Sequence, residues 1–148
     1  MKLLSICSST LAALSLCFSS ISSATKLSYE NSIEKCYKNI VNQTEHEVIS
    51  RCLDTVINAV DKELQIWINL HQFNLEEKAQ VNGRYSALKM FKRSQSSFIT
   101  YRENTCRWQY LNISPDLGAD VAYKACYVTL SQTRINTLKN IDTDIEAS

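Results

Sequence analysis

Glycine and proline are nearly absent from this chain of 148 residues, which contains only 2 glycines and 1 proline. Turn-rich β-sandwiches and glycine-rich phosphate-binding loops depend on these residues, so their scarcity argues against such folds. Segments that alternate β-branched or aromatic residues with polar ones over the length of a strand are also few. Helices joined by a few loops are therefore favoured, and 45% hydrophobic residues are enough for one small domain with a core.

A strong excess of charge of either sign is also missing, since 16 basic residues face 15 acidic ones. The most basic stretch, residues 84–107, contains Glu103 as its sole acid. A basic stripe of this size is too weak for a nucleic-acid binder and is better interpreted as a solvated helix face. No nucleic-acid partner is therefore expected.

Residues suited to catalysis or metal binding are scarce as well. The chain has two histidines, His46 and His71, and neither belongs to a recognisable arrangement of nucleophile and base, paired carboxylates or metal ligands. We predict no catalytic residue, no cofactor and no metal site. An enzyme built around His71 and the nearby acids is the less favoured alternative.

The first 24 residues have the order of a secretory signal: Lys2, an apolar stretch, and small residues that end at Ala24. The apolar stretch is short and rich in serine, whereas a membrane-spanning helix needs about 20 mostly apolar residues, so a cleaved signal is favoured over a membrane anchor. Without Lys2 the basic and acidic residues balance. The mature chain is predicted to be exported, to the periplasm or out of the cell, with no membrane attachment.

Cleavage would leave four of the six cysteines, an even number that indicates two disulfides in an exported chain. Zinc is the weaker alternative, because no CxxC motif occurs and both histidines lie far from any cysteine pair in the sequence. Antiparallel helices joined by a short loop would bring Cys106 and Cys126 within roughly 6 Å between α-carbons. Of the three possible pairings, this one needs the least distortion, and it leaves Cys36 and Cys52 to tie an N-terminal arm to the first long helix.

Three segments repeat inward-facing side chains at steps of three and four, which indicates amphipathic helices. The first helix is expected to open with a capping box at Thr44 and Glu47. Residues 74–83 interrupt the pattern and end in Asn-Gly, so a connection is predicted there. The three stripes are Leu53, Ile57, Val60, Leu64, Trp67 and His71; Leu88, Phe91, Gln95, Phe98, Ile99, Arg102, Thr105 and Cys106; and Val121, Ala125, Val128, Gln132, Ile135 and Leu138.

Helices with one apolar face must pack on one another to be stable in water. The predicted fold is all-α: a small antiparallel bundle of three main helices plus a short N-terminal helix or arm, with two disulfides. Asp120 is expected to cap the third main helix. The predicted organisation is a signal peptide at 1–24, a flexible lead-in at 25–35, one helical domain at 36–141, and an acidic, fraying tail at 142–148.

The stretch FKRSQSSFITYRENTC, followed after a loop by ACYVTLSQTRINTLKNI, resembles the signature of the LprI-like lysozyme inhibitors, a group of small exported bacterial proteins. The upstream stretch QTEHEVISRCLDTVINAVDKELQIW resembles the first helix of that family, so the resemblance covers roughly residues 36–141. The positions that carry it are Glu47, Cys52, Asp61, Leu64, Gln95, Phe98, Tyr101, Arg102, Glu103, Cys106, Cys126, Arg134 and Leu138.

These motif residues are interpreted first as parts of the scaffold. Arg102 lies on the inward stripe of the second main helix, where an unpaired charge is costly, so it requires a carboxylate. Asp61 is the first candidate and Glu47 the second. The rings of Phe98 and Tyr101 are expected to fill the core. Gln95 and Arg134 are expected to belong to the same polar network as Arg102 or to a neighbouring one.

The resemblance implies a protein that acts by binding a lysozyme and occluding its glycosidase cleft. Host lysozymes are usually basic, and an acidic surface accelerates association with a basic partner. The expected contacts are therefore Asp116 and Asp120, near the loop between the second and third main helices. The alternative within the same class is an immunity-type protein or secreted effector with a different protein partner.

Overall fold

The protein is an all-helical bundle in the computed structural model, which describes residues 29–38 and 46–146. Its four helices are α1 (Tyr29–Lys38), α2 (His46–Asn82), α3 (Ser86–Ile113) and α4 (Ala119–Glu146). The prediction of three main helices and one short N-terminal helix is confirmed. Within the described ranges no strand is present.

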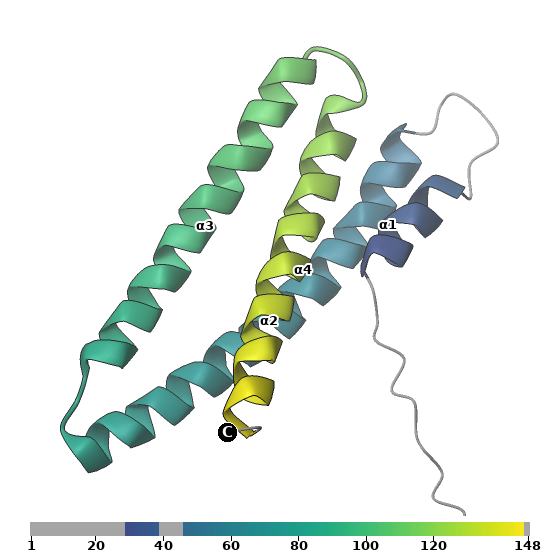
Figure 1. The fold of residues 1–148 in the computed structure, drawn as a ribbon. Helices are drawn as coiled ribbons and strands as arrows, with labels where there is room; N and C mark the ends of the chain where they lie inside the picture. The colour runs from purple at the N-terminus through teal and green to yellow at the C-terminus, as the bar shows by residue number, and fades with distance from the viewer. Residues whose placement is uncertain (1–28, 39–45, 147–148) are drawn as a thin grey trace, which may run out of the picture.

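Of the three long helices, α2 and α3 form a wedge, and α4 fills it (Figure 1). α2 and α3 meet at the short turn that joins them and diverge away from it, and α4 lies in the space between them. α4 accordingly makes the most extensive contacts, with α2 and with α3, whereas α2 and α3 touch each other less. α1 packs on α2 and α4.

The hydrophobic core joins α2 to α4, with α1 covering one side. Its side chains from α4, and those from α2 except Ile49, come from the stripes that the sequence predicted, whereas Tyr29 and Cys36 on α1 belong to none. Burying these side chains removes apolar surface from water, at roughly 25 cal/mol per Å². The larger cluster is formed by Tyr29, Val60, Leu64, Val128, Ile135 and Leu138, and the smaller by Cys36, Ile49, Leu53 and Val121.

Both predicted disulfides are confirmed. Cys36–Cys52 links α1 to α2 with α-carbons 5.7 Å apart, and Cys106–Cys126 links α3 to α4 with α-carbons 5.5 Å apart. One bridge therefore ties the short helix to the bundle, and the other holds the end of α3 against α4, next to their connecting loop.

The connection that was predicted within residues 74–83 begins only at Gly83, because α2 continues without interruption to Asn82. Ala79 is buried, so the segment still packs inward although its residues are largely polar. The helix ends at Gly83, whose φ of +64° lies in the left-handed region that terminates helices and favours glycine. Two long helices are thus joined by residues 83–85 alone.

Other boundaries also differ from those predicted. The flexible lead-in at 25–35 is corrected from Tyr29 onward, because Tyr29 is buried and anchors α1 against the core. α4 begins at Ala119, so Asp120 lies in its first turn instead of capping it. α4 also continues to Glu146, into the segment predicted as a tail. Thr44 and the predicted signal peptide fall outside the described residues.

None of the four helices combines the length and the apolar character that crossing a membrane would require, a finding that applies to the described residues.

Candidate functional site

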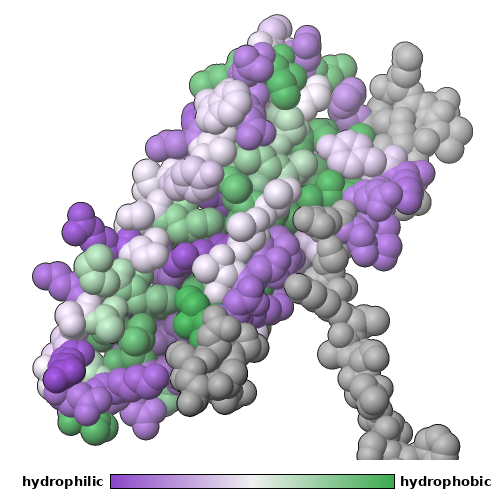
Figure 2. Space-filling model, in the orientation of Figure 1, coloured by the Kyte–Doolittle hydropathy of each residue, from purple (hydrophilic) through white to green (hydrophobic). Residues whose placement is uncertain are grey.

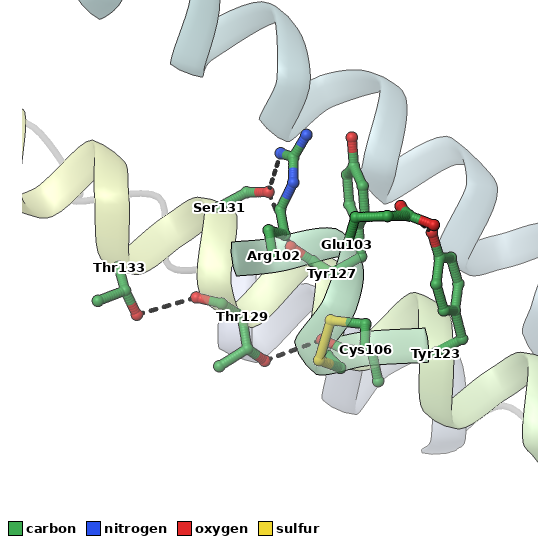
Figure 3. The surroundings of a disulfide bond; sticks show 10 residues. Arg102, Glu103, Cys106, Tyr123, Tyr127, Thr129, Ser131 and Thr133 are labelled. Carbon is green, nitrogen blue, oxygen red and sulfur yellow. Dashed lines mark hydrogen bonds between the residues drawn. A yellow bond between two sulfur atoms is a disulfide. The ribbon is translucent and has the colours of Figure 1, made fainter. Parts of the chain in front are cut away.

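Arg102 occupies the centre of a polar cluster between α2, α3 and α4. It is 8% exposed, and its Nη1 lies 3.3 Å from Asp61 Oδ1 on α2 and 2.7 Å from Ser131 Oγ on α4. Ser131 in turn donates to the backbone carbonyl of Tyr127 at 2.7 Å. Figure 3 shows Arg102 pointing from α3 toward Ser131. The structure thus brings Arg102 to Asp61, the first of its two candidate partners.

The ring of Tyr127 completes this cluster. Its centroid lies 3.8 Å from the Arg102 guanidinium carbon, which places the cation over the ring face. The Tyr127 hydroxyl donates to Asp61 at 3.1 Å. Burial raises the pKa of Tyr127 to about 12, with Arg102 opposing the rise and Asp61 reinforcing it. Because all these groups satisfy one another, the cluster stabilises the packing of three helices.

Arg134 and Gln95 form a neighbouring network between α4 and α3. Arg134 Nε donates to Gln95 Oε1 at 3.2 Å, and Arg134 Nη2 donates to Ser94 Oγ at 2.9 Å. The same guanidinium lies 5.6 Å from the ring centroid of Phe98. Burial lowers the pKa of Arg134. The structure therefore places Gln95 and Arg134 together, and Phe98 contacts both arginines of the motif.

Tyr101 is a correction to the predicted motif. It is 57% exposed, although it directly precedes the buried Arg102. Consecutive residues on a helix are rotated by about 100°, so Tyr101 points away from the bundle. Ile99, included in the predicted inward stripe, is exposed for the same reason. Of the two motif aromatics, only Phe98 packs against the core.

The disulfide between α3 and α4 is flanked by a tyrosine–carboxylate pair. The Tyr123 hydroxyl on α4 donates to Glu103 Oε2 on α3 at 2.8 Å, and the two side chains point toward one another in Figure 3. Burial, together with Glu103, raises the pKa of Tyr123. Glu103 also pairs with Arg107 at 3.5 Å. These contacts reinforce the register that Cys106–Cys126 imposes.

Asp120, one of the two predicted binding residues, is half exposed and contacts residues of α2 and α4. Lys124 Nζ lies 3.2 Å from Asp120 Oδ2 and 2.8 Å from Asp54 Oδ1, and Ser50 also hydrogen-bonds to Asp120. Burial disfavours the charge on Lys124, but the two carboxylates outweigh it and raise the pKa of Lys124. Lys124 thus pairs with both carboxylates, and its contact with Asp54 holds α4 against α2.

The loop between α3 and α4 forms an exposed tip that carries Asp116, the other predicted binding residue. Next to it, Leu117 is 78% exposed, and Leu111 at the end of α3 is also exposed. Figure 2 shows hydrophobic side chains interspersed with hydrophilic ones at this end of the molecule. A shallow hollow of about 300 Å³ lies beside the loop, lined by Arg107, Tyr110, Leu111, Asp120 and Tyr123. We call residues 111–120 the α3–α4 tip.

His71, the centre of the alternative enzyme hypothesis, is buried between aromatic rings. Its ring centroid lies 6.4 Å from that of Trp67 and 5.8 Å from that of Phe91. Its Nε2 donates to the Leu138 carbonyl at 2.9 Å. The side chain therefore helps join α2, α3 and α4. Among the residues that the structure describes, no group of three or more His, Cys, Asp or Glu could hold a metal ion.

Several contact residues were not predicted from the sequence. Tyr127 and Ser131 precede the predicted network residue Arg134 by seven and three positions on one edge of α4, and this spacing was the available signal. Leu117 carried no such signal, because its exposure depends on how the loop is held.

A disulfide-braced helical scaffold whose connecting loop is apolar and acidic is suited to binding another molecule. The sequence matches the family described as lysozyme inhibitor LprI over residues 36–138, most of the chain, and so the protein belongs to this family. This is a family of inhibitors, not of enzymes. No curated protein and no solved structure matches the chain.

Proposed function

We propose that this chain is an exported protein that inhibits a lysozyme by binding it and occluding its active-site cleft. Family membership carries the proposal. Two disulfides, which persist in oxidising compartments, support export to the periplasm or the exterior. Within this proposal residues 1–24 are a cleaved secretory signal, and the helical domain begins at Tyr29.

The α3–α4 tip is the proposed contact surface. Leu117 and Leu111 would bury apolar area on a partner, and Asp116 has an exposed side chain whose carboxylate suits a basic partner. The disulfide Cys106–Cys126 holds the two helices that carry the tip, so little ordering entropy is lost on binding. Asp120 contributes by positioning the beginning of α4, which adjoins the tip, through its contacts with Lys124 and Ser50.

The protein acts in this proposal without catalysis of its own. The support is that the residue types a reaction would use are engaged in structure: His71 with the Leu138 carbonyl, and the four cysteines in disulfides. An immunity-type or effector role with another partner would use the same scaffold, and the assay below separates it from lysozyme inhibition.

The test is a lysozyme activity assay on cell walls, with the purified oxidised protein and several lysozyme types. The wild type should inhibit at least one type, and Leu117→Asp should weaken inhibition roughly tenfold or more, because it removes an apolar anchor. Asp116→Lys should weaken inhibition more at low than at high ionic strength. The matched control is Met90→Asp, an exposed apolar residue on the outer side of α3, which should inhibit like the wild type.

Absence of inhibition by the wild type at high excess over every lysozyme type would overturn the proposed function. Inhibition that Leu117→Asp and Asp116→Lys leave unchanged would overturn the placement of the contact at the tip.

A further inference from the structure

The side of α2 that faces away from α4 carries large apolar side chains. Ile66 is 64% exposed and Phe73 is 65% exposed, and Leu70 between them is exposed as well. They are spaced by four and three residues, so they lie on one stripe, roughly opposite Leu64, which packs on α4. Val81 extends the stripe toward the end of the helix.

Two charged residues lie along this stripe. Lys62 precedes Ile66 by four residues and Glu77 follows Phe73 by four, and both are exposed. Neither makes a salt bridge with another described residue. We define the α2 outer face as Lys62, Ile66, Leu70, Phe73, Glu77 and Val81.

The order of residues on this face is self-complementary when it is read in opposite directions. If two copies of α2 are placed antiparallel about the point midway between Asn69 and Leu70, then Ile66 of one copy lies at the level of Phe73 of the other. In the same register Lys62 of each copy lies at the level of Glu77 of the other. A two-fold interface requires this reciprocity, in which one residue meets a second and the second meets the first in return.

We propose that the α2 outer face binds a second copy of this chain, as an antiparallel α2–α2 pair centred between Asn69 and Leu70. Apolar contacts by Ile66, Leu70 and Phe73 supply the attraction. The two symmetric Lys62–Glu77 pairs set the direction and register, since a parallel pairing would place like charges side by side.

The position of the α2 outer face leaves the α3–α4 tip accessible. The tip is held near the beginning of α2 by Lys124–Asp54, whereas the outer face occupies the second half of α2. An antiparallel pair therefore places the two tips at opposite ends of the dimer. The dimer can then bind one partner at each end, and its existence does not depend on what that partner is.

The test is sedimentation analysis of the purified oxidised chain at concentrations up to about 1 mM, where even an association of millimolar affinity populates a dimer. The wild type should form dimers, and Leu70→Glu should abolish them, because two carboxylates would meet beside the symmetry axis. Circular dichroism establishes that the variant is folded. Met90→Asp, which changes an exposed apolar residue on α3, is the matched control and should leave the dimer unchanged.

Charge exchange tests the antiparallel register. Lys62→Glu and Glu77→Lys should each weaken the dimer roughly tenfold, because each change turns two attractive pairs into repulsive ones. The double variant Lys62→Glu/Glu77→Lys restores opposite charges and should recover most of the wild-type association.

A wild type that remains monomeric over the whole concentration range overturns the proposal, as does a dimer that Leu70→Glu does not affect. Failure of the double variant to recover association overturns the antiparallel register. If Leu70→Glu weakens lysozyme inhibition without changing the sedimentation, the face belongs to lysozyme and not to a second copy. Loss of inhibition by Leu117→Asp with an intact dimer concerns the tip alone, so the two proposals fail separately.

Discussion

The inward faces of α2 and α3 are made of different kinds of residue. α2 buries Leu53, Val60 and Leu64 against α4, whereas the most buried side chains of α3 are Gln95, Arg102 and Cys106. One helix is thus held mainly by apolar burial, and the other by a hydrogen-bonded ion pair and a disulfide. An apolar face tolerates small rotations, but the Arg102–Asp61–Ser131 contacts and Cys106–Cys126 specify one position for α3.

The largest loss of stability is expected for substitutions in α2, the helix that is held mainly by apolar burial. Leu53 is fully buried in the α2–α4 interface, so Leu53→Ala should lower the free energy of unfolding by about 3 kcal/mol, through lost burial and the cavity left behind. Urea unfolding followed by circular dichroism measures the change. Leu117→Ala on the exposed tip should cost less than about 0.5 kcal/mol. Equal losses for both variants would contradict the assignment of Leu53 to the core.

Removing the bridge that holds α3 should have a similar effect. The double variant Cys106→Ser/Cys126→Ser opens a link between residues separated by 20 positions, and the expected loss is about 3 kcal/mol. The matched double variant at Cys36 and Cys52 opens a link of 16 positions and should lose nearly as much if chain entropy alone matters. A much larger loss for the Cys106–Cys126 variant would show that the polar face of α3 depends on its disulfide.

Removing one or the other partner of the ion pair between α2 and α3 should lower the free energy of unfolding by different amounts. Asp61→Ala leaves the Arg102 charge buried with only Ser131 as a polar partner, and should cost about 2 kcal/mol. Arg102→Met leaves a carboxylate that is partly exposed and still bonded to Tyr127, so its cost should stay below about 1 kcal/mol. Urea unfolding of both variants checks this order. A greater loss for Arg102→Met would mean that packing, and not the paired charge, holds α3.

The smallest expected effect depends on pH and concerns α2 and α4. Burial favours the neutral form of Glu63, but its contacts with Lys139 and Tyr29 outweigh burial and lower the pKa below the ordinary 4.5. A carboxyl group with a lowered folded-state pKa stabilises the protein above its unfolded-state pKa and loses this contribution as the pH falls through the folded-state value. Urea unfolding below pH 4.5 should therefore show a shallower acid-induced loss of stability for Glu63→Gln than for the wild type. Parallel acid profiles would contradict this role.

Much of this architecture could be predicted because it depends on local periodicity. The stripes on α2 and α4 and the favoured cysteine pairs follow from residues spaced at three, four or a few turns along helices. The partner of Arg102 was narrowed to Asp61 and Glu47 because a buried charge needs a carboxylate, and the structure selected Asp61. The turn after Asn82 was misplaced because α2 stays helical through a polar segment in which Ala79 is buried. The orientation of Tyr101 was mispredicted because an aromatic ring beside a motif residue says nothing about which side of the helix it occupies.

The amino-acid sequence by itself determined the fold class and the inward residues of α2 and α4, since each depends on spacing along a helix. It favoured the observed cysteine pairs among three possible pairings, and the structure established them. Only the tertiary structure decided that Asp120 is engaged by Lys124, that Leu117 is exposed at the tip, and that Ile66, Leu70 and Phe73 face away from the bundle. The physical reason is that exposure and charge pairing depend on neighbours from other helices. The positions of those neighbours are set by the wedge that α4 fills between α2 and α3.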